Sequence, residues 1–339
     1  MATVLELFNQ KEILNYLKNR TYPALLGETL FPEVKRASLE FDIIKGAGRS
    51  PVIASVHAFD TEAEIGSREA SKMAMELALI KRKLRLGEKE IVALESPRNA
   101  AEEQYLMKQV YDDIDSLVAS VRARIELMRM EVLASGKVTL AENNLSATVD
   151  YGVPANHKEV LSGTSLWSDA ASDPIGDLLE WGNALDAMPT RALTSNTVLS
   201  RLLTHPKVAA ALYGNGTTRM ASRGELNTYL QQLGLPAIAT YDAKYRKQAA
   251  NGTISSARYF PENKIVLFGP DTLGETIYGP TAEEVRLTRD PSIDTQMVGN
   301  VLAMVYEEGA DPVSTWTKAV ATALPSFPEA DNVFQAQVI

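Results

Sequence analysis

Residues 97–136, PRNAAEEQYLMKQVYDDIDSLVASVRARIELMRMEVLASG, form the stretch around which the rest of the chain is organised. Apolar residues recur there at steps of three and four, which places them on one side of a single long helix. They are Leu106, Val110, Ile114, Leu117, Val121, Ile125, Met128 and Val132. Ser96 or Asn99 can cap the start, and Gly136 offers a left-handed stop. At ~1.5 Å per residue the helix would be roughly 55 to 60 Å long, so we expect a strut.

The composition bounds the class of protein. With 339 residues, of which 45% are hydrophobic, the chain can fill a substantial core as one elongated unit or two domains. It has no cysteine, which excludes disulfides and thiolate metal sites. A formal charge of -9 argues against a dedicated nucleic-acid binder, although the protein could line a space that holds DNA. No apolar run approaches the ~18 residues of a membrane span and no signal peptide is evident, so we expect a cytoplasmic protein.

The segment before the strut contains short elements. Residues 5–17 predict an amphipathic helix, and residues 25–34 have no single period, so we expect them to run across a surface. Residues 39–44 predict a short strand. Alternating apolar residues at 52–59 predict a further, extended strand.

Residues 73–86 support two interpretations. Their Ala, Met, Leu, Glu, Lys and Arg residues are good helix formers, which favours a helix. The apolar residues nevertheless alternate with polar or small ones, as in a strand. They occupy the odd-numbered positions Met73, Met75, Leu77 and Leu79, and then the even-numbered positions Leu84 and Leu86. We therefore interpret the segment as a strand with a bulge near residues 81–83 that pairs with residues 52–59 as a long two-stranded arm.

Charge is segregated along this expected arm. Its tip carries Asp60, Glu62 and Glu64, together with Arg68, and its stem carries Lys81, Arg82, Lys83 and Arg85. Such segregation suits docking on a neighbouring subunit, and these eight residues are our candidate intersubunit contacts. A solvated charge run is the alternative interpretation.

The part after the strut predicts a mixed lobe. Residues 137–140 and 146–151 predict a strand pair, and the Gly-, Ser-, Asp- and Asn-rich stretch 153–172 predicts a domain boundary. Beyond it we expect helices and strands in alternation. The helices are at 173–185, 206–213 and 223–233, and the strands are at 192–199 and 237–245. Residues 255–268 predict a hairpin that turns at 261–263.

Two separated segments resemble the major capsid protein E family of tailed phages. They are LFPEVKRASLEFDIIKGAGRSPVIASVHAFDTEAEIGSREAS at 30–71 and ARYFPENKIVLFGPDTLGETIYGPTAEE at 257–284. The resemblance extends from about residue 30 to the C-terminus, and it implies an α+β chain with the HK-97-like fold. It maps 1–45 to the N-terminal arm, 46–90 to the E-loop and 91–172 to the peripheral domain with its spine helix at 97–136. It also maps 173–270 to the axial domain and 271–339 to return strands of the peripheral domain, with strands at 300–306 and 315–323.

The chain carries no recognisable catalytic, cofactor or metal motif. His57, His157 and His205 lack metal-ligand spacing, so we expect surface or structural histidines. The sequence GAGRS at 46–50 lacks the lysine and spacing of a phosphate loop and predicts a turn. The adjacent carboxylates at 112–113, 283–284 and 307–308 point to different faces of a helix or strand. Three scattered tryptophans fit core or interface packing.

Three classes of function remain. The first is a phage shell subunit that assembles with itself into hexamers and pentamers of an icosahedral shell around double-stranded DNA. The second is an encapsulin-like nanocompartment shell, and the third is an enzyme with an α+β core. The resemblance implies residence in the virion after assembly in the host cytoplasm, with portal and decoration proteins as partners. No long helical segment precedes the arm, so we expect scaffolding on a separate chain. Lys72, Lys81 and Lys83 are cross-link candidates by position alone, and solvated lysines are the alternative.

Overall fold

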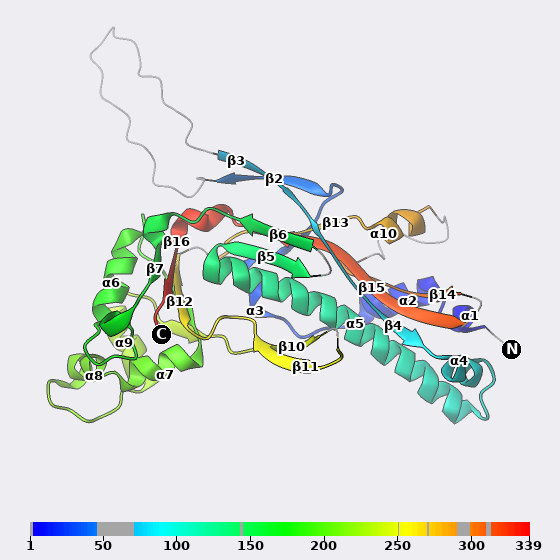
Figure 1. Cartoon of the computed structure of the whole chain (residues 1–339), viewed down its shortest axis with the longest axis horizontal. Coiled ribbons are helices and arrows are strands. Elements are labelled where there is room, and N and C mark those ends of the chain that lie inside the picture. The colour runs from blue at the N-terminus through cyan, green and yellow to red at the C-terminus, as the bar shows by residue number, and fades with distance from the viewer. Residues whose placement is uncertain are drawn as a thin grey trace, which may run out of the picture.

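The computed structural model of the chain describes residues 3–45, 71–142, 145–249, 251–269, 271–289, 299–309 and 313–339. The molecule is elongated along one helix, α5 (Ala100–Ser135) (Figure 1). Asn99 caps its start by accepting a hydrogen bond from the Glu102 N–H, and Gly136 ends it at a φ of 66°. The predicted helix is therefore confirmed, and its apolar stripe from Val110 to Val132 is buried.

Five strands form the sheet against which α5 packs. β15 (Ser314–Pro325) lies at its centre and is antiparallel to β14 (Leu302–Glu308), β13 (Thr276–Gly279) and β4 (Ala78–Leu86), while β1 (Glu33–Lys35) is parallel to β13. The strands predicted at 300–306 and 315–323 are thus confirmed. Apolar side chains of the sheet and the helix share one hydrophobic core.

A second sheet and four helices form the far lobe, at the left in Figure 1. The strand order is β7 (Lys158–Val160), β16 (Val333–Gln337), β12 (Lys264–Phe268), β8 (Arg191–Thr194) and β9 (Ile238–Thr240). The helices are α6 (Pro174–Ala184), α7 (Asn196–Thr204), α8 (Pro206–Tyr213) and α9 (Arg223–Gln232). This lobe has its own apolar core, in which Trp181 stacks between Trp167 and Phe334. The helices predicted at 173–185, 206–213 and 223–233 are confirmed.

The remaining elements are short. They are α1 (Val4–Leu7), α2 (Gln10–Asn19), α3 (Leu26–Leu30), α4 (Glu88–Glu95), α10 (Ala282–Leu287), β2 (Glu40–Lys45), β3 (Ser71–Glu76), β5 (Lys137–Glu142), β6 (Leu145–Asp150), β10 (Lys244–Gln248) and β11 (Ile254–Arg258). Strands β2 and β3, β5 and β6, and β10 and β11 each form a two-stranded sheet. The strand at 39–44 and the pair at 137–151 are confirmed. In the described ranges, no helix combines the length and apolar character that crossing a bilayer requires.

The interpretation of 73–86 as strand is confirmed, but the bulge near 81–83 is wrong, and the partners among the described residues are β15 and β2. Residues 78–86 pair without interruption with β15, and residues 71–76 pair with β2. The buried apolar side chains change from odd- to even-numbered positions at Leu77, which lies between the two strands. The Leu77 N–H donates to the Leu39 carbonyl. Residues 52–59, the expected partner, lie outside the described residues, as does the turn at 46–50.

Four other expectations are wrong in detail. The helix at 5–17 is two helices, because Asn9 caps the second one by accepting from the Glu12 N–H. The strand at 192–199 ends at Thr194, because Ser195 caps α7, and the strand at 237–245 is split into β9 and β10. The hairpin at 255–268 does not form, because β11 pairs with β10 whereas β12 pairs with β8 and β16.

The end of the chain joins the two lobes. β16, expected among the returning strands, instead lies in the second sheet between β7 and β12. Gln335 donates from Nε2 to the carbonyls of Val132 and Leu133, and Lys264 donates from Nζ to the carbonyl of Ala134. The bonds to Leu133 and Ala134 satisfy carbonyl groups that the last turn of a helix leaves unpaired, so the second sheet holds the end of α5.

Candidate intersubunit surfaces

A polar stripe on α5 receives the N-terminal segment, residues 3–35. Asp115, Arg122, Glu126 and Arg129 follow one another at steps of seven, four and three, which places them on one side of the helix. The carboxylate of Asp115 accepts hydrogen bonds from the hydroxyls of Tyr16 (2.7 Å) and Tyr22 (2.9 Å) and pairs with Arg20 at 2.9 Å. Burial and the hydrogen bond to Asp115 raise the pKa of Tyr16 to about 12.

The centre of this stripe is a buried ion pair. Glu126 and Arg129 are 0% and 1% exposed, and the Oε2 of Glu126 lies 3.5 Å from the Nη1 of Arg129. The other carboxylate oxygen accepts from the Gly27 N–H and from the Tyr241 hydroxyl, both at 2.9 Å. A Cβ at position 27 would overlap both Glu126 and Arg129, so glycine is required there by close approach.

Arg129 extends the network into the sheet. It donates to Thr276 of β13 at 2.8 Å and to Glu33 of β1 at 2.9 Å. Burial alone would raise the pKa of Glu33, but hydrogen bonds from Asn300, Tyr278 and Arg129 outweigh it and lower that pKa. The N-terminal segment is thus held to both the helix and the sheet by charge-assisted hydrogen bonds.

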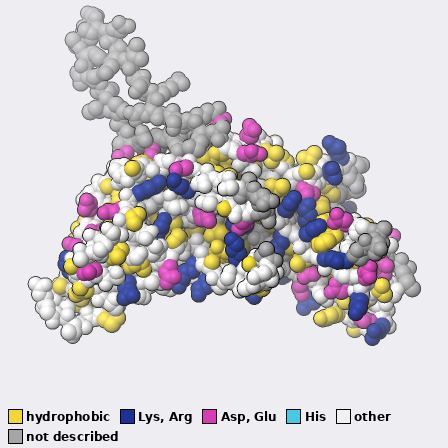
Figure 2. All heavy atoms as spheres, in the orientation of Figure 1, with side chains coloured by type: hydrophobic (Ala, Val, Ile, Leu, Met, Phe, Trp, Pro, Cys, Tyr) yellow, Lys and Arg dark blue, Asp and Glu magenta, His cyan; other side chains and the backbone are white. Residues whose placement is uncertain are grey.

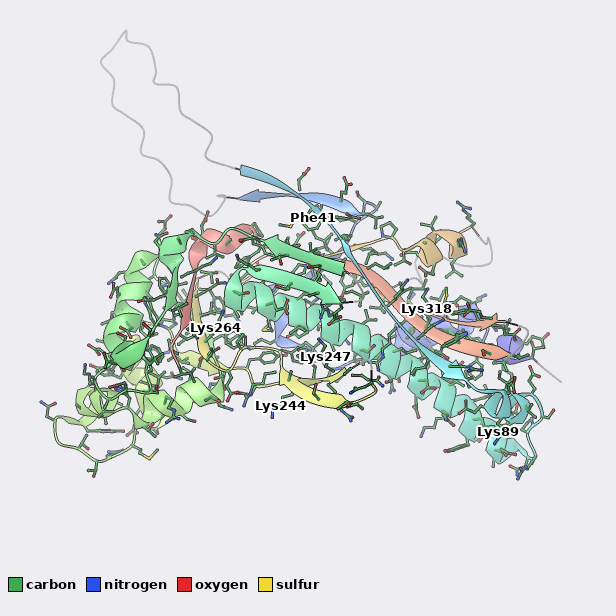
Figure 3. All side chains as sticks on the ribbon, viewed as in Figure 1. Phe41, Lys89, Lys244, Lys247, Lys264 and Lys318 are labelled. Carbon is green, nitrogen blue, oxygen red and sulfur yellow. The ribbon has the colours of Figure 1, made fainter. Side chains whose placement is uncertain are left out.

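Strands β2 and β3 form the base from which residues 46–70 depart. They pair over six residues on each strand, from Glu40 opposite Glu76 to Lys45 opposite Ser71. Phe41, which Figure 3 labels, lies directly opposite Met75, and both side chains are buried. This two-stranded sheet is therefore anchored on the body of the subunit.

The structure places only half of the eight predicted contact residues. Asp60, Glu62, Glu64 and Arg68 lie outside the described residues. Lys81, Arg82, Lys83 and Arg85 lie on β4, inside the five-stranded sheet and not on the stem of a free arm, because β4 pairs with β15. Their assignment to the arm stem is therefore wrong, although all four side chains are exposed.

Two of these basic residues already have partners within the subunit. Lys83 lies 3.4 Å from the Oε2 of Glu308 and 3.8 Å from the ring centroid of Trp316. Arg82 donates to the side chain of Gln248 at 3.0 Å. Lys81, Lys83 and Arg85 alternate along β4 and so share one face of the sheet.

Sequence reasoning missed the polar stripe on α5. Its spacing is legible in the sequence, but a charged side of a long helix is ordinarily solvated, and only the fold shows that the N-terminal segment covers it. The expected structural role of the histidines is confirmed for His205, which caps α8 through Nδ1 and is buried. His57 lies outside the described residues. Within the described ranges, no cluster of His, Asp and Glu residues is suited to hold a metal ion.

Known structures share this architecture. A putative capsid protein of a prophage from E. coli CFT073 superposes with a TM-score of 0.65 and 15% identity, over 98% of this chain and 99% of the other. A phage-related protein from Bordetella bronchiseptica RB50 gives a TM-score of 0.52 and 14% identity, over 96% of each chain. The fold is the expected α+β, HK-97-like fold of phage capsid proteins.

Comparisons of sequence identify the family. No curated protein sequence matches the chain. The family model described as phage major capsid protein E matches residues 9–338, which is nearly the whole chain. The chain therefore belongs to the phage major capsid protein E family, whose members are structural subunits of a shell built from many copies and not enzymes.

Proposed function

We propose that this capsid protein forms the hexamers and pentamers of an icosahedral shell that encloses double-stranded DNA. The family match over residues 9–338 is the observation that carries the proposal. The domain limits given above for the arm, E-loop, peripheral and axial domains are part of it, except that β4 belongs with the peripheral domain, and β7 and β16 with the axial domain. The elongated subunit supports it, because a long rigid helix that spans two lobes gives each copy several separate surfaces for neighbours (Figure 1).

The net charge fits a container for DNA. The chain carries a formal charge of -9, and Figure 2 shows acidic and basic side chains interspersed on the face it displays. A shell whose inner surface lacks a strong positive potential binds DNA phosphates weakly. The DNA can therefore slide along that surface while it is packaged. Scaffold, portal and decoration proteins are further partners under this proposal, and assembly takes place in the host cytoplasm.

Electron microscopy of purified protein tests the shell. Expression of the chain, alone and with a candidate scaffold, should give closed particles with five-fold and six-fold clusters in negative stain. Nuclease-protected duplex DNA in particles recovered from infected cells supports the phage role. Particles that enclose a protein cargo and no nucleic acid would instead support an encapsulin-like compartment.

We also propose that the arm at residues 46–70 contacts a neighbouring subunit. Its base on β2 and β3 is held to the body by the buried pair of Phe41 and Met75, so the intervening residues start from a fixed position. The acidic Asp60, Glu62 and Glu64 are candidates for pairing with the exposed Lys81, Arg85 and their neighbours on β4 of the next copy.

Charge reversal tests this contact. Asp60→Lys with Glu62→Lys should leave the subunit folded and slow assembly at low salt, because attraction between opposite charges becomes repulsion. Addition of Lys81→Glu with Arg85→Glu should restore the rate. Assembly of the first variant at the wild-type rate would count against the arm contact.

A further inference from the structure

The ribbon formed by β10 and β11, residues 244–258, is a basic segment that lies outside the two larger sheets. These fifteen residues include four basic side chains and no acidic one. Arg258 is neutralised by Asp242, and Lys247 lies 3.3 Å from Glu142. Within the described residues, Lys244 and Arg246 have no ion-pair partner, and both are exposed. They share one face of the ribbon, since they are two residues apart on β10.

The opposite charge gathers at the start of α5. Residues 88–113, which we call the acidic end, contain seven acidic and three basic side chains. In the part of the chain that the structure describes, neither Glu103 nor Asp112 has a basic partner. Burial, reinforced by the charges of Glu90 and Asp112, raises the pKa of Asp113, as expected where carboxylates crowd together.

Both surfaces also expose large apolar side chains. Val92 and Tyr105 at the acidic end are 65% and 68% exposed, and Ile254 on the ribbon is 52% exposed. An exposed apolar group surrounded by charge of one sign is typical of an interaction surface when a partner offers the opposite sign.

The two surfaces cannot meet within one subunit. Glu142, the partner of Lys247, also pairs with Arg124, so the ribbon lies beside that turn of α5. Glu103 precedes Arg124 by 21 residues, or about 31 Å along the helix, and Asp112 by 12, or about 18 Å. Figure 3 labels Lys244 and Lys247 on the ribbon and Lys89 near the other end of the molecule.

We infer that the acidic end of one subunit docks on the basic ribbon of a second copy of this chain. The contact joins two different surfaces, so it is heterologous, and repetition of such a contact closes rings or extends lattices. The inference goes beyond the arm contact, and it rests on the proposed shell assembly. A second copy is favoured over DNA because the acidic end supplies the matching charge together with apolar side chains, which a phosphate backbone lacks.

A charge-swap experiment tests the contact. Lys244→Glu with Arg246→Glu, and separately Glu103→Lys with Asp112→Lys, should each slow assembly about tenfold at low salt, measured by light scattering. The four substitutions combined should recover the wild-type rate to within about twofold, because the attraction is restored with its signs exchanged.

Arg201→Glu with Lys207→Glu, which reverses two exposed basic residues of the far lobe, is the matched control and should assemble normally. Thermal unfolding checks that every variant is folded. A folded four-fold variant that stays slow would overturn the inference. So would a ribbon variant that assembles at the wild-type rate but retains less duplex DNA, since the ribbon would then face the genome.

Sedimentation velocity separates this contact from the shell proposal. If wild-type protein forms no shells, the proposed function fails, but the contact still predicts salt-sensitive oligomers of wild-type subunits. The ribbon variant should lack them. Equal oligomerisation of both proteins at low salt would overturn the contact on its own.

Discussion

Single buried residues of α5 are needed for the helix to pack against the five-stranded sheet. Leu117 is 1% exposed and belongs to the apolar core shared by α5 and the five-stranded sheet. We expect Leu117→Asp to prevent folding of the lobe formed by α5 and the five-stranded sheet. An unpaired carboxylate in the core adds a desolvation cost of several kcal/mol to the cost of the lost packing. Circular dichroism during thermal unfolding should show the loss. Ala119→Asp, an exposed position on the same helix, serves as the control, and near-normal stability of Leu117→Asp would contradict its core role.

Glu33 links stability to pH. Its pKa in the folded protein lies below the 4.5 of an unperturbed glutamate, so its ionised form stabilises the fold at pH values above 4.5. That contribution is lost as the pH falls below 4.5 and through the lowered pKa of the folded state. We expect Glu33→Gln to be less stable than wild type at neutral pH and to lose stability less steeply in acid. Urea unfolding between pH 3 and 7 measures how the free energy of unfolding of wild type and of Glu33→Gln changes with pH. Parallel curves for the two proteins would contradict the role of Glu33.

At the scale of elements, the number of strands in a sheet predicts how long its amides stay protected. β4 pairs along its whole length with β15 inside a five-stranded sheet, whereas β10 and β11 pair only with each other in the described structure. Two-stranded ribbons are marginal in water. Hydrogen exchange of unassembled subunits should therefore be slow at residues 78–86 and fast at residues 244–248.

Assembly supplies the comparison for the same amides. If the ribbon docks on a neighbour, its exchange should slow in shells while that of β4 changes little. Fast exchange of residues 78–86 in the free subunit would show that β4 belongs to a mobile arm after all. Unchanged exchange of the ribbon on assembly would argue against its burial between copies.

At the scale of the whole molecule, the last strand holds the far lobe together. β16 lies between β7 and β12, Phe334 stacks on Trp181, and Gln335 binds carbonyls at the end of α5. We expect deletion of residues 333–339 to unfold the lobe that contains α6 to α9, although the last of those helices ends 101 residues earlier. Tryptophan fluorescence of Trp167 and Trp181 should report the exposure. Deletion of Ile339 alone is the control, and a native spectrum of the longer deletion would contradict this account.

The sequence by itself determined the elements whose causes are local. The strut follows from the three- and four-residue spacing of apolar side chains within residues 97–136. The structure confirms its end at Gly136 and selects Asn99, one of the two candidate caps, at its start. Helices α6, α8 and α9 carry their own start signals, such as Asp173 before Pro174. Alternation also predicted that residues 73–86 are extended against their helical propensity, because sheet burial overrides propensity.

Only the tertiary structure decided which strands meet. Residues 255–268 look like a hairpin locally, but β12 gains two buried neighbours, β8 and β16, in the second sheet, whereas a hairpin that turns at 261–263 would give it one. For the same reason β4 lies beside β15, so the basic residues predicted on an arm stem lie on a core sheet. The polar stripe on α5 acquired its role because Gly27 brings the N-terminal segment against Glu126 and Arg129. Periodicity sets the conformation of each segment, but partners are chosen by burial between residues far apart in the chain, which no local pattern records.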